Sequence, residues 1–158
     1  MISRDNLKQI VMMGYLTDEM LDRLTAVTEM NQFEEKEIIF RQGDPADNFY
    51  FLLQGKILLE QRVSPTITVS LSAIKPGHAF GWSAMLDEET YTTEAICAER
   101  CQVLSIQALK LKALCEENHS LGYILSQRLL RVIKKRYDIR TEQFINAIRH
   151  HPDISRLI

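Results

Sequence analysis

The first thirty residues carry apolar side chains at a helical period. These side chains, which recur at i, i+1, i+4 and i+7, are Met20, Leu21, Leu24 and Val27. Thr17 stands just before this stripe, where its side-chain oxygen can cap a helix, and two acidic residues follow it in the first turn. The pattern predicts short N-terminal helices over about residues 4–30.

From about residue 33 to residue 106 the apolar positions change to short β-branched and aromatic runs. Glycine turns separate these runs at Gly43, Gly55 and Gly77, and residues 66–71 alternate apolar and polar side chains. Short strands with glycine turns are typical of an antiparallel β-roll or jelly roll. We therefore expect an α+β fold, mainly β, in which helices flank a roll.

After residue 106 the helical period returns over about residues 107–150. A short helix is followed by a long one, which Asn118 or Ser120 can cap, and no Pro or Gly interrupts residues 123–151. A stripe that repeats every seven residues, with one addition between, consists of Tyr123, Leu130, Ile133, Tyr137 and Phe144. Such a repeat suits a helix pair, so we expect a homodimer through this helix. Burial of the stripe within one molecule is the alternative.

The composition places these elements in one domain over residues 1–158. No apolar run approaches the length of a membrane span, and the N-terminus lacks the apolar stretch of a signal peptide, so we expect a cytoplasmic protein. Its three cysteines form no C-x-x-C pair, which gives no sign of a metal site. No motif of a hydrolase, a P-loop protein or a metalloprotease is present, so we expect no enzymatic activity.

Charge is distributed unevenly along the chain, whose formal net charge is −2. Residues 128–158 carry eight Lys and Arg against three Asp and Glu. The basic side chains that form one face of the long helix are Arg128, Arg131, Lys134, Lys135, Arg136 and Arg140. We interpret them as a solvated face that balances an acidic roll, in the same chain or in a partner. Contacts to nucleic acid are the alternative, which we do not expect for this chain alone.

Three glycine-containing segments carry a resemblance to a known family. Residues 39–47 and 49–56 resemble its first hairpin turn and second strand, and residues 76–81 resemble the approach to its phosphate-binding cassette. On these motifs the chain resembles the cyclic nucleotide-binding domain family, in particular the sensory domains of Crp/Fnr-type bacterial regulators. The resemblance implies a bacterial regulatory protein that acts in signal transduction.

The cassette side chains depart from the family's pattern. The family holds the cyclic phosphate with an Arg and the ribose with a Glu, whereas this chain has Thr92 and Trp82 at those positions, with no Lys or Arg over residues 86–99. An unpaired anion in a partly dry pocket costs several kcal/mol. We therefore expect no cyclic nucleotide in the usual mode and no cofactor. Either a less polar ligand enters this pocket, or Trp82 and Tyr91 fill it.

The candidate ligand-binding residues combine the cassette with two positions of the long helix. They are Phe80, Gly81, Trp82, Ser83, Ala84, Tyr91, Thr92, Thr93, Arg136 and Tyr137. We expect a stand-alone regulatory sensor that signals through its long helix to a small-molecule ligand, a second copy or a protein partner, with no membrane contact. The alternatives are a ligand-free interaction module and the sensory fragment of a Crp/Fnr-type regulator. Residues 141–158 are too few for the winged helix-turn-helix domain of those regulators.

Overall fold

The structure is a computed structural model that describes residues 1–157. Its helices are α1 (Arg4–Lys8), α2 (Asp18–Thr25), α3 (Ala108–Glu117) and α4 (His119–Arg149), with 3-10 helices at Val11–Met13 and Trp82–Met85. Its strands are β1 (Thr28–Phe33), β2 (Ile38–Phe40), β3 (Asn48–Gln54), β4 (Ile57–Arg62), β5 (Thr68–Ile74), β6 (Ala79–Phe80), β7 (Glu94–Cys97) and β8 (Cys101–Gln107). No helix within the described residues is both long and apolar enough to cross a membrane.

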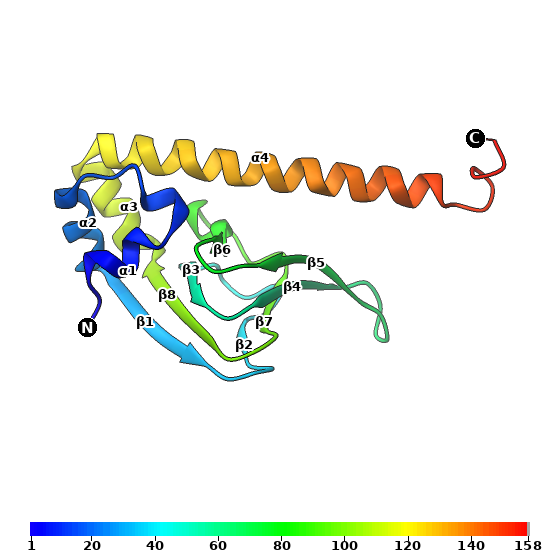
Figure 1. Cartoon of the computed structure of the whole chain (residues 1–158), viewed down its shortest axis with the longest axis horizontal. Coiled ribbons are helices and arrows are strands. Elements are labelled where there is room, and N and C mark those ends of the chain that lie inside the picture. Colours follow the sequence, from blue (N-terminus) through cyan, green and yellow to red (C-terminus); the bar gives the residue numbers. More distant parts are fainter. Residues whose placement is uncertain (158) are drawn as a thin grey trace.

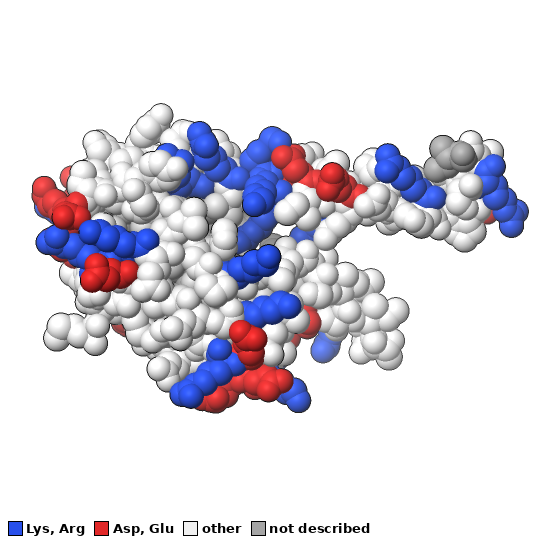
Figure 2. Space-filling model, in the orientation of Figure 1, with Lys and Arg blue, Asp and Glu red and all other residues white. Residues whose placement is uncertain are grey.

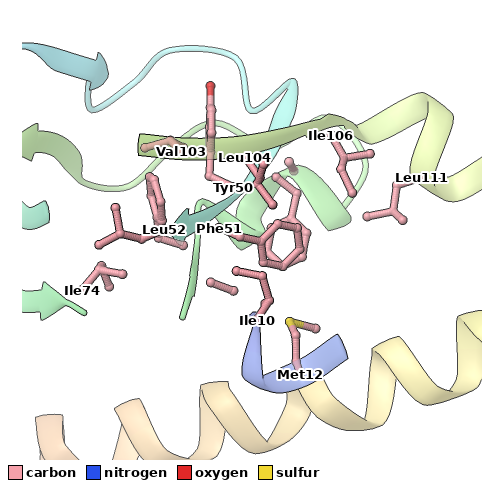
Figure 3. Close-up of a cluster of buried hydrophobic side chains, with 14 of the residues drawn as sticks. Ile10, Met12, Tyr50, Phe51, Leu52, Ile74, Val103, Leu104, Ile106 and Leu111 are labelled. Atoms are coloured by element: carbon pink, nitrogen blue, oxygen red, sulfur yellow. The ribbon is translucent and has the colours of Figure 1, made fainter. Parts of the chain in front are cut away.

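The strands form two antiparallel sheets of four strands, which confirms the expected β-roll with flanking helices. One sheet has the order β1-β8-β3-β6 and the other has the order β2-β7-β4-β5. The core lies between the sheets and under the helices, where Phe51 and Leu104 are fully buried. Figure 3 shows Ile10 and Met12, from the segment before α2, reaching toward this cluster. The N-terminal segment therefore closes the end of the roll that faces α4.

The N-terminal helices end earlier than the sequence pattern predicted. Helix α2 is capped as expected, because the Thr17 side chain accepts a hydrogen bond from the Met20 N–H. It ends at Thr25, however, and residues 28–33 form strand β1 rather than the end of a helix. Strand β1 pairs along its whole length with β8, from Thr28 opposite Ile106 onward. This long-range pairing overrides the weak local pattern, so the roll begins at residue 28 instead of 33.

Helix α4 is the longest element and extends beyond the roll (Figure 1). Its 31 residues correspond to about 46 Å at the usual rise per residue. Only Leu121 and Leu125 are buried, and both lie in its first two turns. The rest of the helix presents one flank to the roll and leaves most of its surface uncovered.

Asn118 fixes the start of α4, and its loss provides a first test of the fold. The Asn118 side-chain oxygen accepts a hydrogen bond from the Leu121 N–H. We expect Asn118→Ala to lower the free energy of unfolding by about 1 kcal/mol, whereas Asn118→Asp should retain the cap and most of the stability. Urea unfolding of the three proteins measures this difference. Equal midpoints for the Ala variant and the wild type would show that the cap does not stabilise α4.

Candidate functional site

A cavity of about 280 Å³ lies between the cassette turn, strands β4 and β5, and α4. The turn begins at Gly81, whose φ of +72° lies in the left-handed region. A Cβ atom at this position would lie 2.9 Å from the Tyr50 ring, so only glycine fits without a shift of that ring. The tight turn starts the 3-10 helix Trp82–Met85 and sets the Trp82 side chain beside the cavity.

Arg136 enters this site from the opposite wall. Its guanidinium carbon lies 4.2 Å from the centre of the Trp82 ring, and its Nη2 donates a hydrogen bond to the Ala79 carbonyl. The Nη1 atom is buried and has no hydrogen-bond partner within the described chain. Burial lowers the pKa of Arg136 to about 10 from the ordinary 12.5. A desolvated cation with an unused donor group thus stands at the edge of the cavity.

Stacked aromatic rings form the inner wall. Phe40 and Tyr91 stack with their ring centres 3.8 Å apart. The Tyr91 hydroxyl donates to the Asn48 carbonyl at 2.6 Å and accepts from the Asn48 N–H at 3.1 Å. Burial raises the pKa of Tyr91 well above its ordinary value, which keeps the phenol neutral. Tyr91 is therefore a fixed wall of the cavity, fully engaged with the backbone of β3.

Comparison of the sequence with known protein families identifies the family of this chain. Residues 30–118 match the sequence model described as "Cyclic nucleotide-binding domain", which is more than half of the chain. The chain belongs to the cyclic nucleotide-binding domain family. It is a regulatory domain of that family.

Curated relatives that are similar in sequence support the assignment to this family. The global nitrogen regulator of Nostoc sp. is 27% identical over 128 residues, which are 80% of this chain and 55% of that protein. A cAMP-dependent protein kinase regulatory subunit of Dictyostelium discoideum is 32% identical over 89 residues, 53% of this chain and 27% of that protein. The chain thus spans about half or less of these relatives.

Among solved structures, the fold is shared over most of the chain. A putative cyclic nucleotide-binding protein from Geobacter metallireducens superimposes with a TM-score of 0.76 and 28% identity, covering 87% of this chain and 99% of that one. The catabolite activator protein of Thermus thermophilus gives a TM-score of 0.71 at 22% identity, covering 84% of this chain and 62% of that one. The second likeness shows the fold alone.

Eight of the ten candidate ligand-binding residues predicted from the sequence line the cassette cavity. They are Gly81, Trp82, Ser83, Tyr91, Thr92, Thr93, Arg136 and Tyr137. Phe80 and Ala84 do not line it, so their role in ligand binding stays a prediction. Both are fully buried, because strand β6 directs Phe80 onto the Tyr50 ring, 5.2 Å away, and the 3-10 helix turns Ala84 inward. These two side chains pack in the core beneath the cassette turn.

Strands β4 and β5 add residues that the sequence analysis missed, among them Gln61 and Ser72. Side chains alternate between the two faces of a strand, so the sequence alone divides β4 and β5 into two sets of residues. Which set faces the cavity follows only from the pairing of β4 with β5 and β7. Arg140 and Ile133, which the sequence placed on the basic face and on the apolar stripe, also line the cavity. The cassette segment itself carries no cation, yet the cavity has two, both supplied by α4.

The cysteines lie apart from this cavity. Cys97 and Cys101 are buried as free thiols, and burial raises the pKa of Cys97 to about 12, so it is protonated near neutral pH. Within residues 1–157 no group of three His, Cys, Asp or Glu side chains gathers where it could hold a metal ion.

Proposed function

We propose that this chain is a regulatory sensor module that binds a small ligand in the cassette cavity and signals through α4. The observation that carries the proposal is the position of Arg136. Its guanidinium links the helix to Trp82 and to the Ala79 carbonyl, and it still has an unused donor group. A ligand that offers an acceptor to Arg136 must act on α4 and on the cassette together.

The ligand we propose is planar, largely apolar and carries one acidic group. The ring wall of Phe40, Trp82 and Tyr91 suits a planar body, and the hydroxyl groups of Thr92 and Thr93 offer hydrogen bonds. An acidic group suits Arg136 and Arg140, because no acidic side chain of residues 1–157 lines the cavity. The usual mode for cAMP or cGMP does not suit it, since Trp82 and Thr92 stand at the positions where the family has its Glu and Arg.

Signalling through α4 is supported by two residues that belong to two surfaces at once. Ile133 and Tyr137 line the cavity and also lie on the exposed apolar stripe of α4. A ligand that shifts these side chains changes the stripe as well. It can do so only through different affinities for two positions of the helix. We therefore propose that ligand binding in the cavity changes the conformation of the stripe.

A homodimer through the same stripe is the second part of the proposal. The exposed fractions are 68% for Tyr123, 59% for Leu130, 37% for Ile133, 67% for Tyr137 and 64% for Phe144. Tyr123, Leu130, Tyr137 and Phe144 follow one another at seven-residue spacing over about 31 Å of helix. An apolar stripe of this length on a regulatory domain requires a cover, and the repeat suits a second copy of α4. A ligand-free dimerisation module is the alternative function that this observation favours.

Trp82 makes the test direct, because it is the sole tryptophan of the chain. We expect benzoate, phenylacetate or phenyl phosphate to change the Trp82 emission and to raise the melting temperature, since a ligand of the native state stabilises it. At equal concentration cAMP and cGMP should do neither. Strong binding of cAMP would contradict the proposed ligand class. No response to any of the five compounds would contradict the sensor and favour the ligand-free module.

A further inference from the structure

A second hollow, of about 580 Å³, runs along the flank of α4 next to the cassette cavity. Helix α4 contributes residues from Arg128 to Gln143, which spans about 22 Å of helix. The other wall comes from β5, from the turn after it, and from the segment around Val11. We call this hollow the basic groove. Arg136 is shared between the groove and the cavity, while the other α4 residues of the groove lie outside the cavity.

The basic groove carries positive charge that the chain does not neutralise. Its cations are Lys75, Arg128, Arg131, Lys135 and Arg136, and no Asp or Glu of the described part of the chain lines it. Within the described residues none of these five makes an ion pair. Figure 2 shows Lys and Arg side chains gathered over the middle of α4. A concave surface lined by one sign of charge concentrates the opposite charge.

The basic face of α4 therefore does not neutralise acidic side chains of the roll through ion pairs within the described chain. Of the basic residues of that face only Lys134 makes an ion pair among residues 1–157, and its partner is Asp138 of the same helix. His78, at the base of the groove, has its pKa lowered by burial and then by Arg136, Lys135 and Lys75. The lowered pKa favours the neutral form of this histidine, and burial is the largest cause.

The floor of the groove is apolar and partly uncovered. Val11, Tyr15 and Ile139 are 63%, 58% and 44% exposed. The Val11 N–H donates a hydrogen bond to the Gly77 carbonyl at 2.9 Å, which fixes the floor to the turn after β5. The guanidinium of Arg128 lies over the Tyr15 ring. Exposed apolar side chains from the N-terminal segment and from α4 thus line the groove together with its cations.

We propose that the basic groove binds an elongated small-molecule anion with an apolar body, such as a single-chain carboxylate. The acidic head would lie against Arg128, Arg131 and Lys135, which fall within about 10 Å along α4. The chain would lie on the apolar floor. The volume falls within the range of about 300–1,000 Å³ that small-molecule sites have. The cations line a hollow instead of a protruding surface, which disfavours the phosphates of a nucleic acid duplex.

The test uses dodecanoate, kept below its micellar concentration, and the full chain. We expect binding in calorimetry, and at least a tenfold weaker affinity when Arg131→Gln and Lys135→Gln are combined. Lys134→Gln is the matched control, because Lys134 lies on the same helix outside the groove, and its affinity should stay within twofold of the wild type. Dodecyl maltoside, which has the same chain without charge, should bind at least tenfold more weakly. Acetate, which lacks the chain, should not bind.

Four results would overturn the proposal. They are no binding of dodecanoate, equal binding of dodecyl maltoside, an unchanged affinity in the double variant, and a loss of affinity in Arg140→Gln alone. The last result would place the probe in the cassette cavity, because Arg140 lines the cavity and not the groove. Binding of anionic phospholipid vesicles or of polyglutamate without binding of dodecanoate would assign the groove to a membrane or to a protein partner. The Trp82 response to phenyl phosphate, which tests the cassette cavity, is measured separately.

Discussion

Leu130→Asp combined with Phe144→Asp is expected to convert the proposed dimer into a monomer. Both side chains are more than half exposed on the single chain, and both lie on the seven-residue stripe of α4. In a symmetric pair of helices the two substitutions place four carboxylates in an apolar seam, where burial of unpaired charge costs several kcal/mol each. Light scattering should then give 18.3 kDa for the variant and twice that mass for the wild type.

The control for this experiment changes charge on the same helix without touching the stripe. Asn146→Asp adds one carboxylate at an exposed position that faces away from the stripe. It should leave the mass of the dimer unchanged. Because Leu130 and Phe144 do not line the cassette cavity, the double variant should keep its Trp82 response to phenyl phosphate. A wild type that is monomeric at all concentrations, or a variant that remains dimeric, would rule out this stripe as the interface.

Local signals in the sequence were sufficient for most of the fold. The caps at Thr17 and Asn118 lie where the side chains predicted them, since a cap depends on residues within one turn. The glycine turns mark the ends of the strands because few other residues adopt a positive φ. Strand β1 was missed, because its sequence shows no clear alternation and its conformation depends on β8, some seventy residues away.

The candidate site was predictable from sequence only in part, for a similar reason. The turn residues from Gly81 to Ser83 are adjacent in the chain, so a motif identifies them together. The contact between Trp82 and Arg136 joins two elements 54 residues apart in the sequence, so it depends on how α4 packs on the roll. The cassette positions of the sequence lack the Arg that the family has there. They give no information on α4, which supplies a cation to the same cavity.

Arg136→Met is expected to weaken ligand binding without destabilising the empty protein. A hydrogen bond to a charged group contributes about 1.5–3 kcal/mol, so we expect the affinity for phenyl phosphate to fall about 10- to 150-fold. Methionine is apolar and flexible, so it can lie on Trp82 in place of the guanidinium. The substitution also removes a desolvated cation whose Nη1 has no hydrogen-bond partner among the described residues. Titration of the Trp82 emission measures the affinity, and thermal unfolding measures the stability.

The pH dependence of stability distinguishes this role from simple packing. The pKa of Arg136 is about 10 in the folded chain and close to 12.5 when unfolded, so the unfolded state binds more protons between these values. The wild type should therefore gain stability relative to Arg136→Met as the pH rises from 10 toward 12.5. A phosphate or carboxylate bound to Arg136 favours the charged form, so saturation with phenyl phosphate should reduce that gain. An unchanged affinity in Arg136→Met would show that Arg136 does not contact the ligand. A stability difference between the two proteins that does not change with pH would show that Arg136 is not desolvated in the empty cavity.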